Sequence, residues 1–134
     1  MKPNKLSIMF GLLAVLLASL ACGGSFSTAN ISESWMATDI EGTNRTTVFS
    51  PEDDFYAFVD LQNAPDDTQL RAVWTAINAA DTEPNLVINE TEYTSSDQVV
   101  YFQLFNDQLW PAGSYKVEVY LNDTLATTMT FEVR

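Results

Sequence analysis

The chain has 134 residues, with 18 acidic and six basic side chains and a formal net charge of −12 at pH 7. It contains no histidine and one cysteine, which excludes Ser-His-Asp and Cys-His catalysis, histidine-ligated zinc and any disulfide within the chain. A surface this acidic repels phosphate backbones and anionic lipid, so we expect no nucleic acid partner. The length suits one domain with one core.

An export signal is predicted over residues 1–21. Lys2 and Lys5 form a short positive end, and segment 6–20 is apolar, which is the layout of a secretory signal peptide. We expect this segment to be helical and to be removed from the mature protein, so that it takes no part in the fold. Its removal leaves four basic residues against all 18 acidic ones.

Cys22 directly follows the small residue Ala21, and this junction resembles the lipobox of bacterial lipoproteins. The resemblance implies that the signal is cut before Cys22 and that acyl chains on this residue attach the protein to the membrane. Two or three acyl chains give stable anchoring, whereas one gives marginal binding. Gly23 stands where some lipoproteins carry an aspartate that retains them at the inner membrane, which favours an outer location.

Two alternatives to lipid attachment remain open at this junction. Ser19 stands where the lipobox usually has leucine, and Ser19-Leu20-Ala21 also fits the small-x-small pattern of ordinary signal cleavage, which would give a soluble secreted protein. The apolar segment could instead be retained as an anchor, although a spanning helix needs about 20 apolar residues. All three interpretations export the chain.

Residues 22–30 are mostly small and polar, so we interpret them as the lipidated cysteine followed by a flexible tether. From residue 31 onward, alternation of apolar and polar residues with period two predicts strands rather than helices. Strand 70–77 has the pattern of a half-buried strand, strand 86–94 is polar enough for a sheet edge, and strand 99–105 has the composition of a central strand. The strands predicted before the last hairpin cover residues 31–38, 46–49, 55–62, 70–77, 86–94 and 99–105.

The last hairpin has the clearest pattern in the sequence. Alternation over residues 115–121 is followed by Asn122-Asp123, a hairpin turn signal, and then by a second alternating segment. In that second segment, every other side chain is expected to face the core, namely Leu125, Thr127, Met129, Phe131 and Val133.

About seven short strands with regular turns predict an antiparallel β-sandwich over residues 31–134. Residues 110–119, Trp-Pro-Ala-Gly-Ser-Tyr-Lys-Val-Glu-Val, resemble the penultimate strand of bacterial immunoglobulin-like or fibronectin-III-like modules. The resemblance implies a single all-β, immunoglobulin-like domain. It further implies that the hydroxyl of Tyr115 bonds to nearby backbone and that Trp74 is the buried tryptophan of the core.

Acidic clusters are candidates for metal or catalytic sites. Residues 52–54 and 66–67 flank the same predicted strand at opposite ends, whereas calcium needs six to eight oxygens around one point. Aspartate is also a common turn former, so we expect no metal and no cofactor. Glycoside hydrolysis needs two carboxylates about 5–10 Å apart, and nothing in the sequence places such a pair on facing elements. We therefore expect no catalytic residues and no enzymatic activity.

Aromatic residues are the candidate partner-binding groups. Tyr56 and Phe58 share one face of strand 55–62, and they would form an exposed patch if the other face packs in the core. Alternatively, loops or neighbours cover that face. Trp110 beside Pro111 either caps the end of the core or contacts a ligand from a loop.

The sequence thus predicts a non-catalytic, lipid-anchored interaction module on the extracytoplasmic side of a bacterial cell envelope. Its membrane attachment is the acylated Cys22, and its partner would be an envelope protein or a surface polysaccharide, bound through Tyr56, Phe58 and Trp110. The alternative is an envelope protein that binds a small ligand or calcium, and a small hydrolase is the third possibility.

Overall fold

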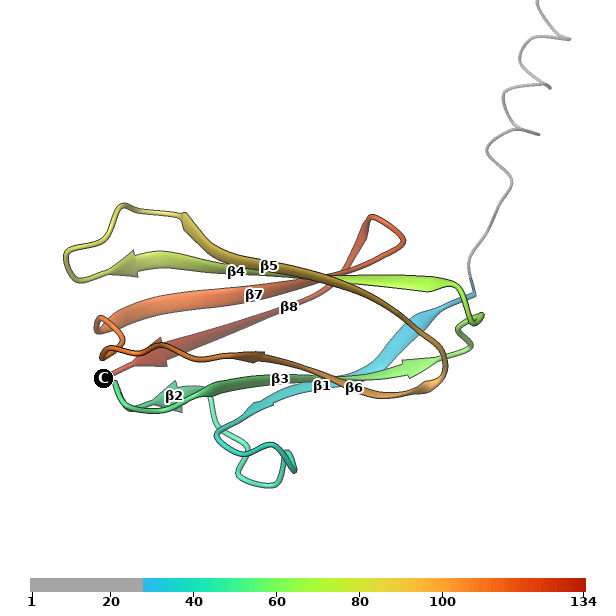
Figure 1. Ribbon diagram of the computed structural model, residues 1–134, viewed down its shortest axis with the longest axis horizontal. Helices are drawn as coiled ribbons and strands as arrows, with labels where there is room; N and C mark the ends of the chain where they lie inside the picture. Colours follow the sequence, from blue (N-terminus) through green and yellow to red (C-terminus); the bar gives the residue numbers. More distant parts are fainter. Residues whose placement is uncertain (1–27) are drawn as a thin grey trace, which may run out of the picture.

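The computed structural model describes residues 28–134, so the predicted signal peptide, Cys22 and most of the predicted tether lie outside the described residues. Two β-sheets face each other across one core (Figure 1). Within residues 28–134, the structure has no helix whose length and hydropathy would let it cross a membrane. The strands are β1 (Asn30–Ala37), β2 (Val48–Phe49), β3 (Phe55–Gln62), β4 (Thr68–Ala79), β5 (Leu86–Ser95), β6 (Gln98–Leu104), β7 (Gly113–Leu121) and β8 (Thr124–Val133).

The sheets contain three and five strands. The smaller has the order β1-β3-β6, and the larger has the order β2-β8-β7-β4-β5. Neighbouring strands are antiparallel, except that the two-residue β2 pairs in parallel with β8. The predicted all-β sandwich is therefore confirmed. It has eight strands when the short β2 is counted.

The core lies between the sheets and is rich in aromatic side chains. Trp74 of β4 is fully buried, as the sequence predicted. Tyr115 of β7 is also buried, and its hydroxyl donates to the backbone oxygen of Pro111, as the resemblance implied. Burial raises the pKa of that hydroxyl. Gly113 begins β7 with φ +154°, and a Cβ there would lie 2.2 Å from the Asn78 carbonyl oxygen, so only glycine fits.

Two strands differ from their predicted positions in the sheets. The segment predicted as central, 99–105, is β6, an edge of the smaller sheet. Its composition is misleading because apolar residues lie on both faces: Val100 is buried in the core, whereas Val99 is 52% exposed on the outside. The predicted half-buried strand, now β4, is instead buried on both faces along its middle, including Val73 and Thr75. On the outer face these two residues lie between longer side chains of β5 and β7, such as Glu118 and Lys116.

The last hairpin is confirmed, with one local correction. Asn122 and Asp123 form its turn, both with positive φ, and Met129, Phe131 and Val133 face the core as predicted. The prediction for Leu125 is wrong, because the β7–β8 register shifts between Val119 and Tyr120. Such a bulge changes the phase of the alternation, so Leu125 opposes the outward-facing Tyr120 and is 48% exposed.

The sandwich has two distinct ends. At the entry end, where the described chain begins, the Thr28 hydroxyl donates to the carbonyl of Asn63, 2.8 Å away. Asp97, in the β5–β6 turn at this same end, accepts a hydrogen bond from the backbone of Ala64. The loop end is opposite and carries loops 50–54, 80–85 and 105–112, whereas loop 38–47 lies against the outside of the three-stranded sheet (Figure 1).

Candidate interaction surface

An aromatic row crosses the outer face of the three-stranded sheet. The strand registers place Trp35, Phe58 and Tyr101 side by side on β1, β3 and β6. Trp35 stacks on Phe58 with ring centroids 5.2 Å apart, and Phe58 lies 5.8 Å from Tyr101. Tyr56 extends the cluster, 6.3 Å from Tyr101, and its hydroxyl accepts a hydrogen bond from Gln103. The row is therefore a second apolar cluster, outside the main core.

Residues 38–47, here called the cover loop, shield much of this row. Its Gly42 lies so close to Phe58 that an added Cβ would be 3.0 Å from the ring. The Trp35 indole donates to the Gly42 carbonyl over 3.1 Å, and the Arg45 guanidinium stacks 4.1 Å from the Trp35 ring centroid. Tyr56 and Phe58 are only 8% and 4% exposed. Of the two predicted alternatives for this face, the exposed patch is therefore absent, and the cover loop and neighbouring strands bury the two residues as the other alternative has it.

Asp39 fixes the shape of the cover loop. Its carboxylate accepts a hydrogen bond from the Thr43 hydroxyl and two more from the backbone N–H groups of Thr43 and Asn44, at 3.2 and 2.9 Å. These bonds favour the charged form, the Thr43 hydroxyl most strongly, and they lower the pKa of Asp39 below its ordinary value of 3.8.

Acid is expected to loosen the cover loop. A lowered folded-state pKa means that Asp39 stabilises the loop above its unfolded pKa, and that this contribution is lost as the pH falls through the folded value, below 3.8. Amide chemical shifts of Thr43 and Asn44, followed by NMR, should titrate in that acid range. In an Asp39→Asn variant the same shifts should not titrate there. A wild-type midpoint at or above 3.8 would contradict the assignment.

Trp110 caps the loop end of the core, which is the first of the two predicted alternatives. Its ring stacks on Phe55 at 4.6 Å, its indole N–H donates to the Asp53 carbonyl and its backbone N–H donates to Pro51. These bonds fix one side of loop 105–112. Leu109, immediately before the anchor, is left 63% exposed.

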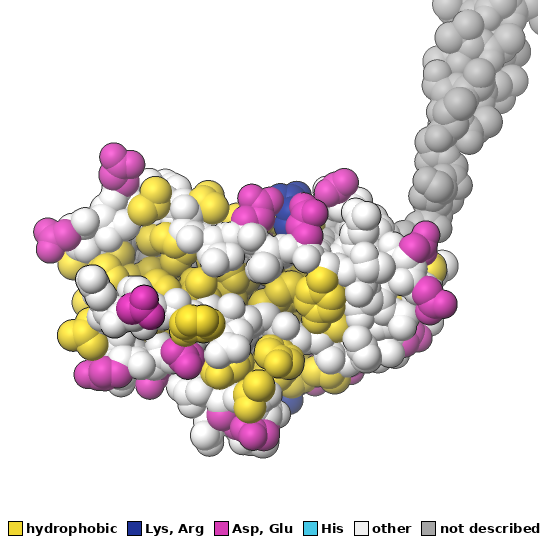
Figure 2. Space-filling view, in the orientation of Figure 1, with side chains coloured by type: hydrophobic (Ala, Val, Ile, Leu, Met, Phe, Trp, Pro, Cys, Tyr) yellow, Lys and Arg dark blue, Asp and Glu magenta, His cyan; other side chains and the backbone are white. Residues whose placement is uncertain are grey.

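The sequence interpretation missed an exposed apolar strip along β6 and the loop after it. It consists of Val99, Tyr101, Phe105 and Leu109, which are 43–64% exposed, and we call it the β6 strip. Figure 2 shows hydrophobic side chains gathered across the middle of this side of the molecule, with carboxylates around the rim. The available signal is the apolar character of both faces of the segment, which also fits a central strand.

The charges around the β6 strip are all acidic. Asp97 directly precedes β6, Asp60 opposes Val99 in the register, and Asp107 lies in the following loop. Desolvation and the nearby Asp54 carboxylate raise the pKa of Tyr56, which lies beside the strip. Every basic side chain in residues 28–134 is in an ion pair elsewhere: Arg45–Glu33 beside β1, and Arg71–Glu90, Lys116–Glu118 and Arg134–Glu132 along the five-stranded sheet.

A groove beside the cover loop does not have the features of a catalytic cleft. It has a volume of about 500 Å³ and lies between β1, β8 and the cover loop, lined by Trp35, Arg45 and Met129 among others. Its lining contains no carboxylate, whereas glycoside hydrolysis needs two. In the part of the chain that the structure describes, no three acidic, cysteine or histidine side chains gather as metal ligands would.

Comparison with known proteins identifies the fold. No family profile matches the chain, and no curated protein matches it. An immunoglobulin-like protein from Pseudomonas aeruginosa matches with a TM-score of 0.54 and 15% identity, over 83% of this chain and 100% of that one. The DNA glycosylase AlkC from Pseudomonas fluorescens matches with a TM-score of 0.54 and 12% identity, over 81% of this chain. This chain spans 31% of the length of that enzyme. At such identities the likeness shows the fold alone, an immunoglobulin-like β-sandwich.

Proposed function

We propose that this chain is a non-catalytic interaction module, exported and attached by lipid to the extracytoplasmic side of a bacterial cell envelope. The observation that carries the binding role is the β6 strip. Val99, Tyr101, Phe105 and Leu109 place exposed apolar side chains along one edge of the sandwich. Apolar patches of this kind with a polar rim are typical of protein interaction sites.

The rigidity of the scaffold supports this role. The loop after β6 is anchored by Trp110, and Tyr101 packs beside Phe58 of β3, which stacks on Trp35 of β1. A surface that is already ordered loses less conformational entropy on binding than a flexible one. The β6 strip therefore suits recognition of a partner without rearrangement of the domain.

The sequence of the N-terminal region supports the lipid anchor. Cys22 follows an apolar segment in a lipobox-like junction, and seven residues, 23–29, separate it from Asn30, where strand β1 begins. Because the chain enters the sandwich at the end opposite loop 105–112, an anchor at Cys22 would leave that loop facing away from the membrane.

Replacing Cys22 with alanine tests the anchor. We expect the wild-type chain, expressed with its signal in a bacterial host, to partition into the detergent-rich phase and the Cys22→Ala variant to partition into the aqueous phase. Ser25→Ala, a similarly small change in the predicted tether, should leave partitioning unchanged. A Cys22→Ala variant that stays in the detergent phase would show that the apolar segment, not lipid, is the anchor. Wild-type protein in the aqueous phase would show ordinary cleavage.

Affinity capture tests the binding role. The full chain in mild detergent is immobilised and exposed to envelope extract, and a saturable component is expected to bind. Tyr101→Asp, which adds a charge to the exposed centre of the β6 strip, should reduce that binding, whereas Thr130→Asp on the exposed outer face of β8 should not. Equal binding by both variants would contradict a role for the strip.

A further inference from the structure

The four sheet edges of the sandwich differ in how they are protected against pairing with another strand. An exposed edge presents unpaired N–H and C=O groups, and proteins usually block it with charges, bulges, proline or very short strands. The three-stranded sheet ends at β1 and β6, and the five-stranded sheet ends at β2 and β5.

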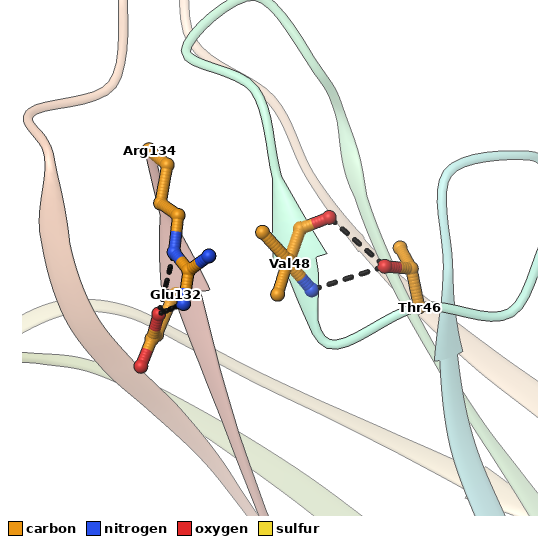
Figure 3. Close-up of polar contacts among 4 residues, drawn as sticks. All are labelled: Thr46, Val48, Glu132 and Arg134. Carbon is orange, nitrogen blue, oxygen red and sulfur yellow. Dashed lines mark hydrogen bonds and ion pairs between the residues drawn. The ribbon is translucent and has the colours of Figure 1, made fainter.

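Three of these edges carry such protection. β1 has a register irregularity between Ile31 and Glu33. β5 has a register irregularity where it pairs with β4, and it also carries two glutamates. β2 is two residues long, and its outward backbone is already satisfied: the Thr46 hydroxyl accepts from the N–H of Val48 at 3.0 Å and donates to its C=O at 2.9 Å (Figure 3). Beside it, Arg134 pairs with Glu132 of the neighbouring β8.

β6 has none of these protections. Its seven residues, Gln-Val-Val-Tyr-Phe-Gln-Leu, contain no charge, proline or glycine. Its pairing with β3 runs from Gln98 to Leu104 without a register shift, so the strand is regular along its length. Among residues 28–134, no strand pairs with its other edge.

Tyr93 of the larger sheet lies next to this edge. Tyr93 of β5 pairs with Leu70 of β4, and the two share the core-facing side of the sheet. Leu70 is fully buried, whereas Tyr93 is 40% exposed, with its ring 5.6 Å from that of Phe102 of β6. A further strand beside β6 would therefore have apolar surface to cover.

We propose that β6 is a docking edge that takes an extended, positively charged segment of a partner protein as the fourth strand of the three-stranded sheet. Backbone pairing would supply affinity, and side chains alternating along the added strand would supply specificity. The charge of the partner follows from the acidic surroundings, Asp60, Asp97 and Asp107, and from the pairing of the basic side chains elsewhere. A second copy of this chain would bring the same carboxylates together, which favours a cationic partner instead.

The inference rests on the proposed binding role, and a displayed library of random peptides of about nine residues, long enough to pair along β6, tests it directly. The full chain in mild detergent should select peptides in which Lys or Arg alternates with β-branched or aromatic residues. Methylation of alternate backbone nitrogens should abolish their binding, because it removes the donors of an added strand. Hydrogen exchange of β6 amides should slow in the complex.

Two matched valines provide the variant and its control. Val99 on β6 and Val87 on β5 are 52% and 55% exposed, so lysine at either position should preserve the fold. Val99→Lys should lower the affinity for the selected peptides by about tenfold or more. Val87→Lys should change that affinity by less than about threefold. Equal effects, retained binding of methylated peptides, or selection of acidic or no peptides would overturn the proposal.

Two further outcomes separate this proposal from the broader binding role. If the full chain sediments as a dimer that Val99→Lys dissociates, the occupant of the β6 edge is a second copy, and the cationic partner is wrong. If the component captured from envelope extract binds Val99→Lys as well as wild type, the chain is still an interaction module but β6 is not its docking edge.

Discussion

Removal of the chain from Thr128 onward is expected to abolish cooperative folding. The deleted segment contains Met129, Phe131 and Val133, which are 9%, 2% and 2% exposed. Burial of one large apolar side chain contributes about 1.5–3 kcal/mol, so the three together approach the whole stability of a typical domain, about 5–15 kcal/mol. The deletion also removes the partner of β2 and exposes the edge of β7.

Circular dichroism during heating, together with NMR shift dispersion, measures this effect. The truncated chain should show no cooperative transition and little dispersion. Thr130→Ser, a change on the exposed face of the same strand, should leave both unchanged. A truncated protein that stays monomeric and melts cooperatively would contradict the assignment of these residues to the core.

Phe55→Ala is expected to cause the largest loss of stability for a single substitution. Phe55 is fully buried, and five other aromatic rings surround it: Phe49, Trp74, Trp110, Tyr115 and Phe131, with centroids 4.6–6.3 Å away. Truncating a core phenylalanine costs about 3–5 kcal/mol through lost burial and the cavity that remains. At about 4 °C or more per kcal/mol for a domain of this size, Tm should fall by at least about 12 °C.

Phe105→Ala is the matched control, because Phe105 is 64% exposed on the β6 strip. Its free energy of unfolding in urea should change by less than about 0.5 kcal/mol, the usual range for surface substitutions. Similar losses for the two variants would show that Phe55 is not at the centre of the core.

Local sequence patterns predict much of the fold. Segment 55–62, predicted as a strand with apolar residues on both faces, matches β3, and both of its faces are largely buried. Asn122 and Asp123 predict the position of the last hairpin, since these residues tolerate the positive φ that its turn requires. The bulge that turns Leu125 outward has no comparable local signal, because it depends on how β7 and β8 align.

The edge position of β6 could not be predicted from its composition. Val99 and Tyr101 are apolar like the core residue Val100 between them, and only the sheet order shows that no strand in the described chain covers that edge. The burial of Tyr56 and Phe58 likewise depends on the cover loop. The contact of Gly42 with Phe58 joins positions far apart in the sequence, so no periodicity of β3 could show it.

The place of β8 also sets when the domain can fold. Val48 of β2 pairs with Glu132 of β8, so the five-stranded sheet cannot close until residue 132 has left the ribosome. Folds dominated by such distant pairings form slowly, because a long loop must be closed before its contacts are gained. If the chain is exported as proposed, its signal would reach the export machinery long before the sandwich could form. Late folding of this kind would keep the chain extended, and so competent for translocation.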